Sequence, residues 1–277
     1  MARVLIITKF LPDGRAWGGM LRTQNLTDAL RKRFDVQMVG YVESGRPSPR
    51  GKPFAAAVAL STGKAYQIAR YDTGVIRRVI RDAVDSFQPD VLHVEYLQMA
   101  TTCWDLELPA VLDLQNVESA FAESIAGASS GLARRLAQRD ARLLRSLEER
   151  CAERFEFITV PSAKEVARMP GNAHVVGNGV DPSQEVPRVA PDPRLLVFVG
   201  TMSWLPNIEG AEWFVRHVLP LLPSDFRLEL VGRTPHRRIL ALQSDRVTVA
   251  ADVPDTMPHV ARAGVVIAPL LSPGGFS

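Results

Sequence analysis

The chain of 277 residues lacks features that mark several common protein classes. It has only two cysteines, Cys103 and Cys151, at no spacing typical of a metal site or a disulfide framework, so we expect a reducing, cytoplasmic environment. It has no apolar run long enough to span a bilayer. Its 33 basic and 30 acidic side chains give a net charge of +3, without the excess expected of a nucleic-acid-binding protein.

Two motifs of nucleotide-dependent enzymes are also missing. No G-x-G-x-x-G follows either strand at which a domain would begin, which disfavours a dinucleotide-dependent oxidoreductase. No Asp-x-Asp motif stands at the end of a predicted strand, so we expect no cofactor and no obligatory metal. No lysine occurs after Lys164, which leaves few cations for binding an anion in the C-terminal part.

The chain does contain one arrangement twice: an apolar strand, a glycine-bearing loop and a helix. Residues 3–8 predict a buried strand, which is followed by Gly18, Gly19 and a helix over 19–32. Residues 195–199 predict a second one, followed by Gly200 and a helix over 207–222. Strands and helices alternate along the rest of the chain, which predicts an α/β fold with parallel sheets.

The remaining pattern predicts two Rossmann-like domains. Further strands are expected at 35–39, 90–94, 110–114, 156–160, 173–176, 227–231, 247–249 and 265–268, and helices at 71–87, 132–154 and near 254–262. Four prolines between 182 and 193 predict a linker, which places the domains at 1–187 and 188–277. Because the second has four predicted strands where five or six are usual, we expect it to be incomplete and the chain to be truncated at its C-terminus.

Several short motifs, in order, run through the whole chain: Gly18-Gly19, HVEY at 93–96, DLQNVE at 113–118, VPS at 160–162, NGVD at 178–181, FVGTMSWLPN at 198–207, VGR at 231–233, and APL at 268–270 before Gly274-Gly275. Together they resemble the retaining glycosyltransferases of family 4, which have the GT-B fold of two facing Rossmann-like domains, and bacterial sugar transferases most of all. The resemblance implies transfer of a hexose from a nucleoside-diphosphate sugar to a hydroxyl of a sugar, lipid-linked or small-molecule acceptor, with retention of configuration.

Glycines and one arginine are the candidate donor-binding residues. Gly18 and Gly19 let the backbone approach a ligand and open a helix whose N-terminus favours a phosphate. The same reasoning applies to Gly200, Thr201 and Asn207, and in both places the alternative is an ordinary turn. Arg233 is the best cation for a leaving diphosphate, or else a solvated arginine. The resemblance adds Gly274 and Gly275, the turn before the family's main donor contacts.

The candidate catalytic residues follow the strand at 110–114. The resemblance places Gln115, Asn116 and Glu118 close to the transferring sugar. The family usually has a histidine where Gln115 stands, and a glutamine exchanges hydrogen bonds but carries no proton at neutral pH. The alternative for Asn116 and Glu118 is helix-start chemistry, because an acidic residue is favourable in a first turn.

Two further features concern the acceptor and the membrane. His93 and Glu95 are two residues apart in a strand, so they share a face and are candidate acceptor-side residues; the alternative is a buried, hydrogen-bonded histidine. The helix at 132–154 has seven arginines, four acids and a leucine face, which fits either a peripheral contact with the inner membrane face or a solvated helix packed on the sheet. A nucleotide-sugar 2-epimerase and a non-catalytic remnant or binding module are the alternative functions.

Overall fold

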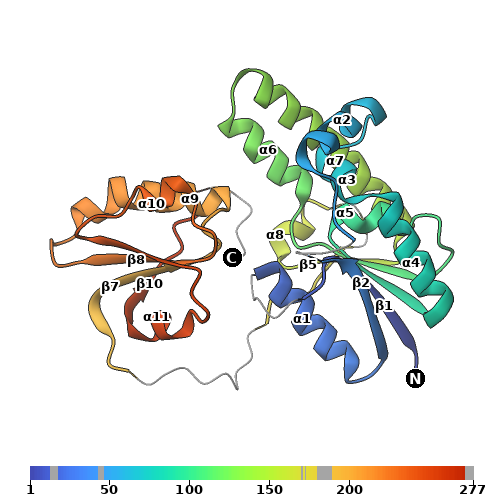
Figure 1. The fold of residues 1–277 in the computed structure, drawn as a ribbon, viewed down its shortest axis with the longest axis horizontal. Coiled ribbons are helices and arrows are strands. Elements are labelled where there is room, and N and C mark those ends of the chain that lie inside the picture. Colours follow the sequence, from blue (N-terminus) through green and yellow to red (C-terminus); the bar gives the residue numbers. More distant parts are fainter. Residues whose placement is uncertain (13–17, 43–46, 170, 172, 180–188, 272–277) are drawn as a thin grey trace. The chain divides into compact units, whose positions relative to one another are not determined.

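The structure is a computed structural model that describes the chain except for residues 13–17, 43–46, 170, 172, 180–188 and 272–277 (Figure 1). The chain divides into two compact units, Met1–Gly179 and Val180–Gly275, called unit 1 and unit 2 below. The predicted linker lies largely outside the described residues. Each unit is an α/β domain built on one parallel sheet, which confirms the predicted fold class.

Unit 1 is built on a six-stranded parallel sheet in the order β2-β1-β3-β4-β5-β6. Its strands are β1 (Arg3–Phe10), β2 (Asp35–Tyr41), β3 (Val91–Glu95), β4 (Ala110–Asp113), β5 (Phe157–Val160) and β6 (Ala173–Val175). The apolar centre of β1 is buried from Val4 to Ile7, as expected for a strand covered on both faces. Each predicted strand of this unit is present within two residues of its expected ends, and β1 and β2 each extend two residues further at the C-terminal end.

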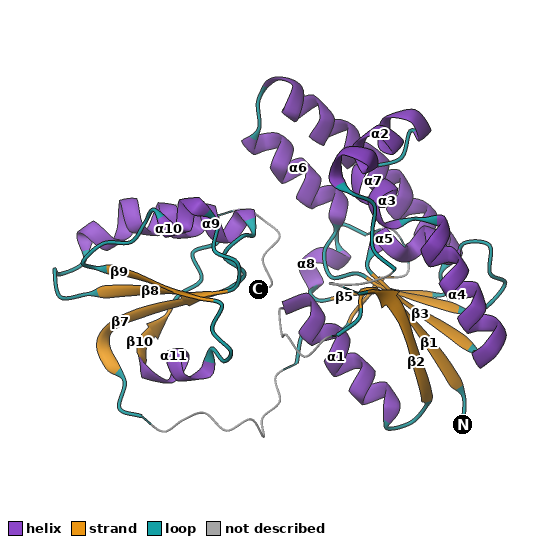
Figure 2. Cartoon of the chain, in the orientation of Figure 1, coloured by secondary structure: helices purple, strands orange, loops and turns teal. Residues whose placement is uncertain are grey.

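Helices cover both faces of this sheet, and α1 and α4 lie on opposite faces (Figure 2). The helices are α1 (Gly18–Arg31), α2 (Lys52–Thr62), α3 (Tyr66–Tyr71), α4 (Gly74–Phe87), α5 (Leu97–Ala100), α6 (Glu118–Ala128), α7 (Gly131–Arg154) and α8 (Ala163–Val166). The strand order changes direction at β1, so right-handed crossovers place α1 and α4 on different faces.

One helical prediction in unit 1 was wrong in detail. The helix expected from Tyr71 starts at Gly74 because the Thr73 hydroxyl caps it, accepting a hydrogen bond from the Ile76 amide at 3.2 Å. Tyr71 instead ends the separate helix α3. The helices α2, α3 and α5 were not predicted; α3 and α5 have six and four residues, too few to show a helical repeat.

Unit 2 is built on a four-stranded parallel sheet in the order β10-β7-β8-β9. Its strands are β7 (Asp192–Val199), β8 (Arg227–Gly232), β9 (Val247–Ala251) and β10 (Ala263–Val266), and its α-helices are α9 (Leu205–Trp213), α10 (Arg237–Leu240) and α11 (Met257–Arg262). The helix expected over 207–222 starts two residues earlier and changes to a π-helix and then a 3-10 turn (Leu219–Leu221) that contains Pro220. The last strand lies two residues before its predicted position.

Each unit has its own hydrophobic core. In unit 1 the core lies between the sheet and the helices α3 to α7, and in unit 2 it lies between β7, β8 and α9. β10 is an edge strand in the described sheet, and Val265 and Val266 are about half exposed. No helix among the described residues has the length and apolar character needed to cross a membrane.

Candidate functional site

The polar side chains of unit 1 gather where β1, β3 and β4 end. These three strands are neighbours in the sheet, and α1, α5 and α6 begin just beyond them. Ligands of parallel α/β sheets bind outside the carboxyl ends of the strands, near the point where the strand order reverses. In unit 1 that point lies at β1 and β3, which makes this end of the sheet the candidate site.

Gly19 and Gln115 meet at this end of the sheet. The Gln115 side-chain amide donates a hydrogen bond to the Gly19 carbonyl at 3.0 Å, across 96 residues of sequence. Gln115 is buried, and its Oε1 atom has no hydrogen-bond partner in the described part of the chain. Gly18 is the first residue of α1, as the loop-to-helix prediction required. The predicted catalytic glutamine therefore touches the predicted glycine loop and keeps one acceptor oxygen unused.

His93 and Glu95 lie on one face of β3, with the His93 Nε2 and Glu95 Oε1 atoms 3.7 Å apart. Glu95 is fully buried and accepts a hydrogen bond from the Thr23 hydroxyl of α1, which also lies 3.2 Å from the Gly19 carbonyl. Neither His93 Nε2 nor Glu95 Oε1 has a hydrogen-bond partner among the described residues. The pair lies against α1, and its acceptor-side role stays a prediction.

A buried ion pair that we did not predict joins α1 to β4. The Arg22 guanidinium donates two hydrogen bonds to the Asp113 carboxylate, at 2.9 and 2.7 Å, and a third to the Asn178 Oδ1 at 2.9 Å. Burial disfavours the Arg22 charge, but the Asp113 carboxylate outweighs burial, so the pKa of Arg22 is raised. Asp113 stands at the end of a buried strand within the DLQNVE motif, and this position could have marked it as a site residue from sequence alone.

Glu118 is the first residue of α6, and it faces a lysine that we also did not predict. Burial raises the pKa of Glu118, while Lys9 and a hydrogen bond with the Gln98 side chain oppose the rise. Burial lowers the pKa of Lys9, which the Glu118 charge opposes and the Arg70 charge reinforces. Asn116 is half-buried in the bend between β4 and α6. Glu118 thus fulfils the helix-start expectation and also belongs to a charged cluster.

Unit 2 brings four predicted donor-site residues together at the carboxyl ends of β7 and β8. The Gly200 amide donates to the Val231 carbonyl at 3.0 Å, and the Met202 amide donates to the Arg233 carbonyl at 3.0 Å. The Asn207 side-chain amide donates to the Thr201 carbonyl at 3.0 Å. Asn207 is buried and lies in the first turn of α9, so its side chain fixes the loop, as the ordinary-turn alternative expects.

The two strand ends approach each other closely enough to require glycine. A Cβ atom on Gly232 would lie 1.7 Å from the Gly200 carbonyl oxygen, and a Cβ on Gly200 would lie 2.5 Å from Asn207 Nδ2. The position of Gly200 is therefore set by backbone packing, and Arg233 follows directly on β8. Gly274 and Gly275 lie outside the described residues.

Comparison with known families bears on this second unit. Residues 193–277 match the family model described as "Glycosyl transferases group 1". The matched segment covers β7 to β10, together with the Gly200 loop and Arg233. A search of curated protein sequences finds no match to the chain.

Solved structures extend the comparison to the whole chain. Sucrose-phosphate synthase from Thermosynechococcus elongatus has a TM-score of 0.67 at 14% identity, over 99% of this chain and 77% of that one. The UDP complex of S. aureus MnaA has a TM-score of 0.52 at 11% identity, over 96% and 74%. The apo form of the lipopolysaccharide outer core galactosyltransferase WaaB has a TM-score of 0.52 at 10% identity, over 98% and 74%. These neighbours support a GT-B-type, two-domain Rossmann-like fold.

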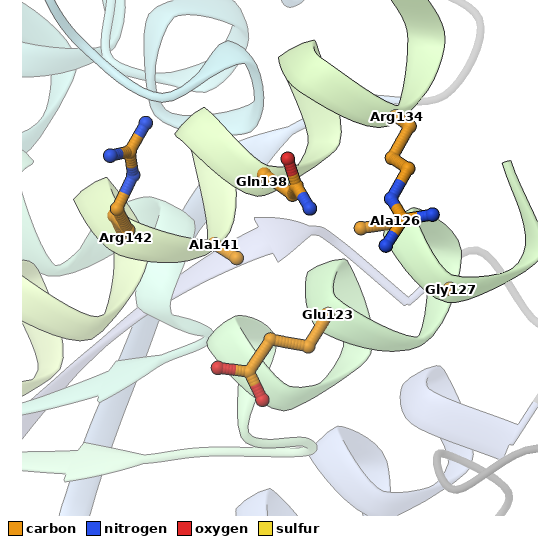
Figure 3. Close-up of a pocket in the computed structure, with 7 residues that line it drawn as sticks. All are labelled: Glu123, Ala126, Gly127, Arg134, Gln138, Ala141 and Arg142. Atoms are coloured by element: carbon orange, nitrogen blue, oxygen red, sulfur yellow. The ribbon is translucent and has the colours of Figure 1, made fainter. Parts of the chain in front are cut away.

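A further hollow of about 490 Å³ lies between α6 and α7 of unit 1 (Figure 3). Arg134, Gln138 and Arg142 line it from α7, at a spacing of four residues that puts them on one helix face. Glu123 lines it from α6 and forms an ion pair with Arg145 at 2.6 Å. Nearby, Leu132 and Leu136 are exposed large apolar side chains of α7. Sequence patterning found the basic helix but not the hollow.

Proposed function

We propose that this chain is a retaining glycosyltransferase of the family 4 type that moves a hexose from a nucleoside-diphosphate sugar to an acceptor hydroxyl. The observation that carries the proposal is the match of residues 193–277 to the group 1 glycosyl transferases. In this proposal the carboxyl end of the unit 2 sheet binds the donor, and the carboxyl end of the unit 1 sheet binds the acceptor.

The donor's diphosphate belongs at the Gly200 loop. The glycine pair lets the ends of β7 and β8 pack closely against each other and hold the loop before α9, and the N-terminus of α9 offers amides and a favourable dipole. Arg233 adds a guanidinium at the same strand ends. These groups stabilise the negative charge that develops as the bond between the sugar and the phosphate breaks.

On the acceptor side, transfer with retention needs no protein nucleophile. The acceptor oxygen attacks the anomeric carbon on the face from which the diphosphate leaves, and the hydroxyl proton passes to the departing phosphate oxygen. The unused Oε1 of Gln115 is a hydrogen-bond acceptor for a sugar hydroxyl, and it fits this scheme because a glutamine need not take up the proton. No metal is required, since the leaving charge is met by Arg233 and the helix end.

Release of nucleoside diphosphate from a panel of UDP-, GDP- and dTDP-sugars tests the proposal. We expect release from at least one donor by the wild-type chain, and a reduction of about 10²- to 10³-fold in Arg233→Ala. Calorimetry with UDP and GDP separates the alternatives: a non-catalytic remnant gives no heat, and a 2-epimerase binds nucleotide but converts the donor without an acceptor.

For its location, we propose a cytoplasmic protein that contacts the inner membrane face through α7. Leu132 is 71% exposed and Leu136 is 44% exposed, and both lie close in sequence to the arginines that line the hollow. Exposed leucines beside arginines favour an anionic bilayer surface over free solution.

A further inference from the structure

The strongest unexplained feature of unit 1 is the surroundings of Lys9, at the end of β1. The pairing of β1 with β2 shifts register between Thr8 and Phe10, so Lys9 is the extra residue of a β-bulge. Gly40, opposite the bulge, is needed there because a Cβ atom would lie 2.6 Å from the Thr8 carbonyl. Bulges of this kind re-aim a side chain and are frequent next to active sites.

The neighbouring strand is distorted at the same place. Tyr96, the residue directly after β3, has a φ of +69°, which is unfavourable for a tyrosine. This conformation puts its ring under the lysine, with Lys9 Nζ 4.4 Å from the Tyr96 ring centroid. The ammonium also lies 5.4 Å from the Tyr71 ring and 5.9 Å from the Phe10 ring. The backbone distortions at Lys9 and Tyr96 thus place one amine over three aromatic rings, called the aromatic cage below.

This amine lacks a hydrogen-bonding partner. Among the described residues, Lys9 Nζ has no ion pair within 4.0 Å and no hydrogen bond, although its three N–H groups are strong donors. Glu118 is the carboxylate that acts on it electrostatically, from beyond ion-pair distance. Lys9 is half-buried, so its three N–H groups remain available to a ligand.

An unused acceptor atom belongs to Gln98, the hydrogen-bond partner of Glu118. Gln98 is 3% exposed and makes a hydrogen bond with Glu118, yet its Oε1 atom has no partner in the described structure. Lys9 offers hydrogen-bond donors and Glu118 an acceptor, which together suit a hydroxyl, because a hydroxyl both accepts and donates a hydrogen bond. An anion alone would be repelled by Glu118, and a cation would be repelled by Lys9 and Arg70.

We propose that Lys9 and Glu118, with Gln98 positioning Glu118, form a subsite that binds a sugar or other polyol group of the acceptor. A ligand hydroxyl accepts from the Lys9 ammonium and donates to the Glu118 carboxyl, bridging two groups too far apart to pair directly, while its carbon face lies against the cage. This subsite rests on the proposed function only in assigning the bound sugar to the acceptor.

Saturation-transfer NMR on the full chain tests the subsite without a donor. The probes are the methyl glycosides of glucose, galactose, mannose, N-acetylglucosamine and rhamnose, with saturation of the aromatic protons. We expect at least one glycoside to bind to the wild type, with affinity at least about tenfold weaker in Lys9→Met and partly restored in Lys9→Arg. Lys32→Met, which alters an exposed lysine at the end of α1, is the matched control.

Several outcomes overturn the subsite. The first is that the wild type binds none of the glycosides. The second is that Lys9→Met binds them as tightly as the wild type. The third is that Lys9→Met and Lys32→Met lose the same amount of affinity. Displacement of a bound glycoside by inorganic phosphate at low millimolar concentration also overturns it, because the site would then select anions. Far-ultraviolet circular dichroism shows whether each variant is folded. Nucleotide binding, measured by calorimetry with UDP and GDP, does not involve Lys9. If the wild-type chain binds neither nucleotide, the proposed function is contradicted, but the result for the subsite still stands.

Discussion

The guanidinium of Arg22 and the carboxylate of Asp113 form a two-hydrogen-bond ion pair whose side chains are 3% and 1% exposed. Because Arg22 also binds Asn178, this pair ties the first helix, the fourth strand and the last described residues of unit 1 together. Gly19 and Arg22 belong to α1, and Asp113 and Gln115 stand at the end of β4, so this pair holds together the two elements that make the Gly19–Gln115 contact.

Breaking this pair from one side should be costly. Arg22→Met and Asp113→Asn should each lower the free energy of unfolding by about 3–5 kcal/mol, because each leaves a buried group unpaired. The double variant should lose less than the sum of the two. Urea unfolding measures these values, with Arg31→Met as control: Arg31 pairs with Asp28 at the surface, and its loss should cost about 1 kcal/mol or less. Strict additivity in the double variant would contradict the coupling.

The close approach of Gly232 to Gly200 gives a second prediction. Gly232→Ala should disrupt the loop after β7, because the new methyl group would meet the Gly200 carbonyl. We expect a loss of several kcal/mol in thermal unfolding of unit 2, and weaker binding of nucleoside diphosphates by calorimetry. Gly127→Ala in α6, where a Cβ meets nothing within 4 Å, should instead stabilise unit 1 by about 0.5–1 kcal/mol. A Gly232→Ala variant that melts and binds like the wild type would refute this role.

Lys9 should lower the free energy of unfolding, whereas a lysine that stabilises the fold through an ion pair would raise it. Its pKa is lowered from 10.5, so above its folded pKa and below 10.5 the unfolded chain binds more protons, and stability rises with pH through that window. Below the folded pKa the destabilisation is fully present. Lys9→Met should therefore melt at a higher temperature than the wild type at pH 7, with Glu118 and Arg70 unchanged, and the difference should shrink toward pH 10. A variant that melts lower at pH 7 would show that Lys9 stabilises the fold.

The hollow between α6 and α7 predicts a lipid preference. Co-sedimentation with phosphatidylglycerol vesicles should exceed that with phosphatidylcholine vesicles, and the double variant Arg134→Gln/Arg142→Gln should bind the anionic vesicles about 30-fold less, at about 1 kcal/mol per arginine. Arg78→Gln, on the exposed surface of α4, is the control. Equal sedimentation with both lipids would leave α7 as a solvated helix.

The fold was largely predictable because buried parallel strands are continuous apolar runs. β3 and β4 each follow a proline that marks their start, and the 3.6-residue pattern of α7 is long enough to be distinct. The placement of Gly19, Gly200 and Gln115 at strand ends was predictable from the strand pattern, while their roles in binding and catalysis stay predictions. In each case the signal lay within about fifteen residues of sequence.

The residues that sequence reasoning did not predict owe their place in the site to contacts between segments that lie far apart in the sequence. Arg22 and Asp113 are 91 residues apart, and nothing local distinguishes Arg22 from the other arginines. Lys9 is distinguished only by a bulge opposite Gly40 and by the ring of Tyr96, on another strand. Asn207 was placed correctly at the loop, but its inward side chain follows from the 3.0 Å bond to Thr201, which a strand-and-helix pattern does not encode.

The most direct test of sugar transfer is a product analysis by NMR. The full chain is incubated with a nucleoside-diphosphate sugar labelled with ¹³C at the anomeric carbon and with the methyl glycoside that binds best. We predict a new disaccharide signal whose anomeric configuration equals that of the donor, in the absence of added metal. An inverted product, or donor that stays intact across the whole panel, would contradict the account.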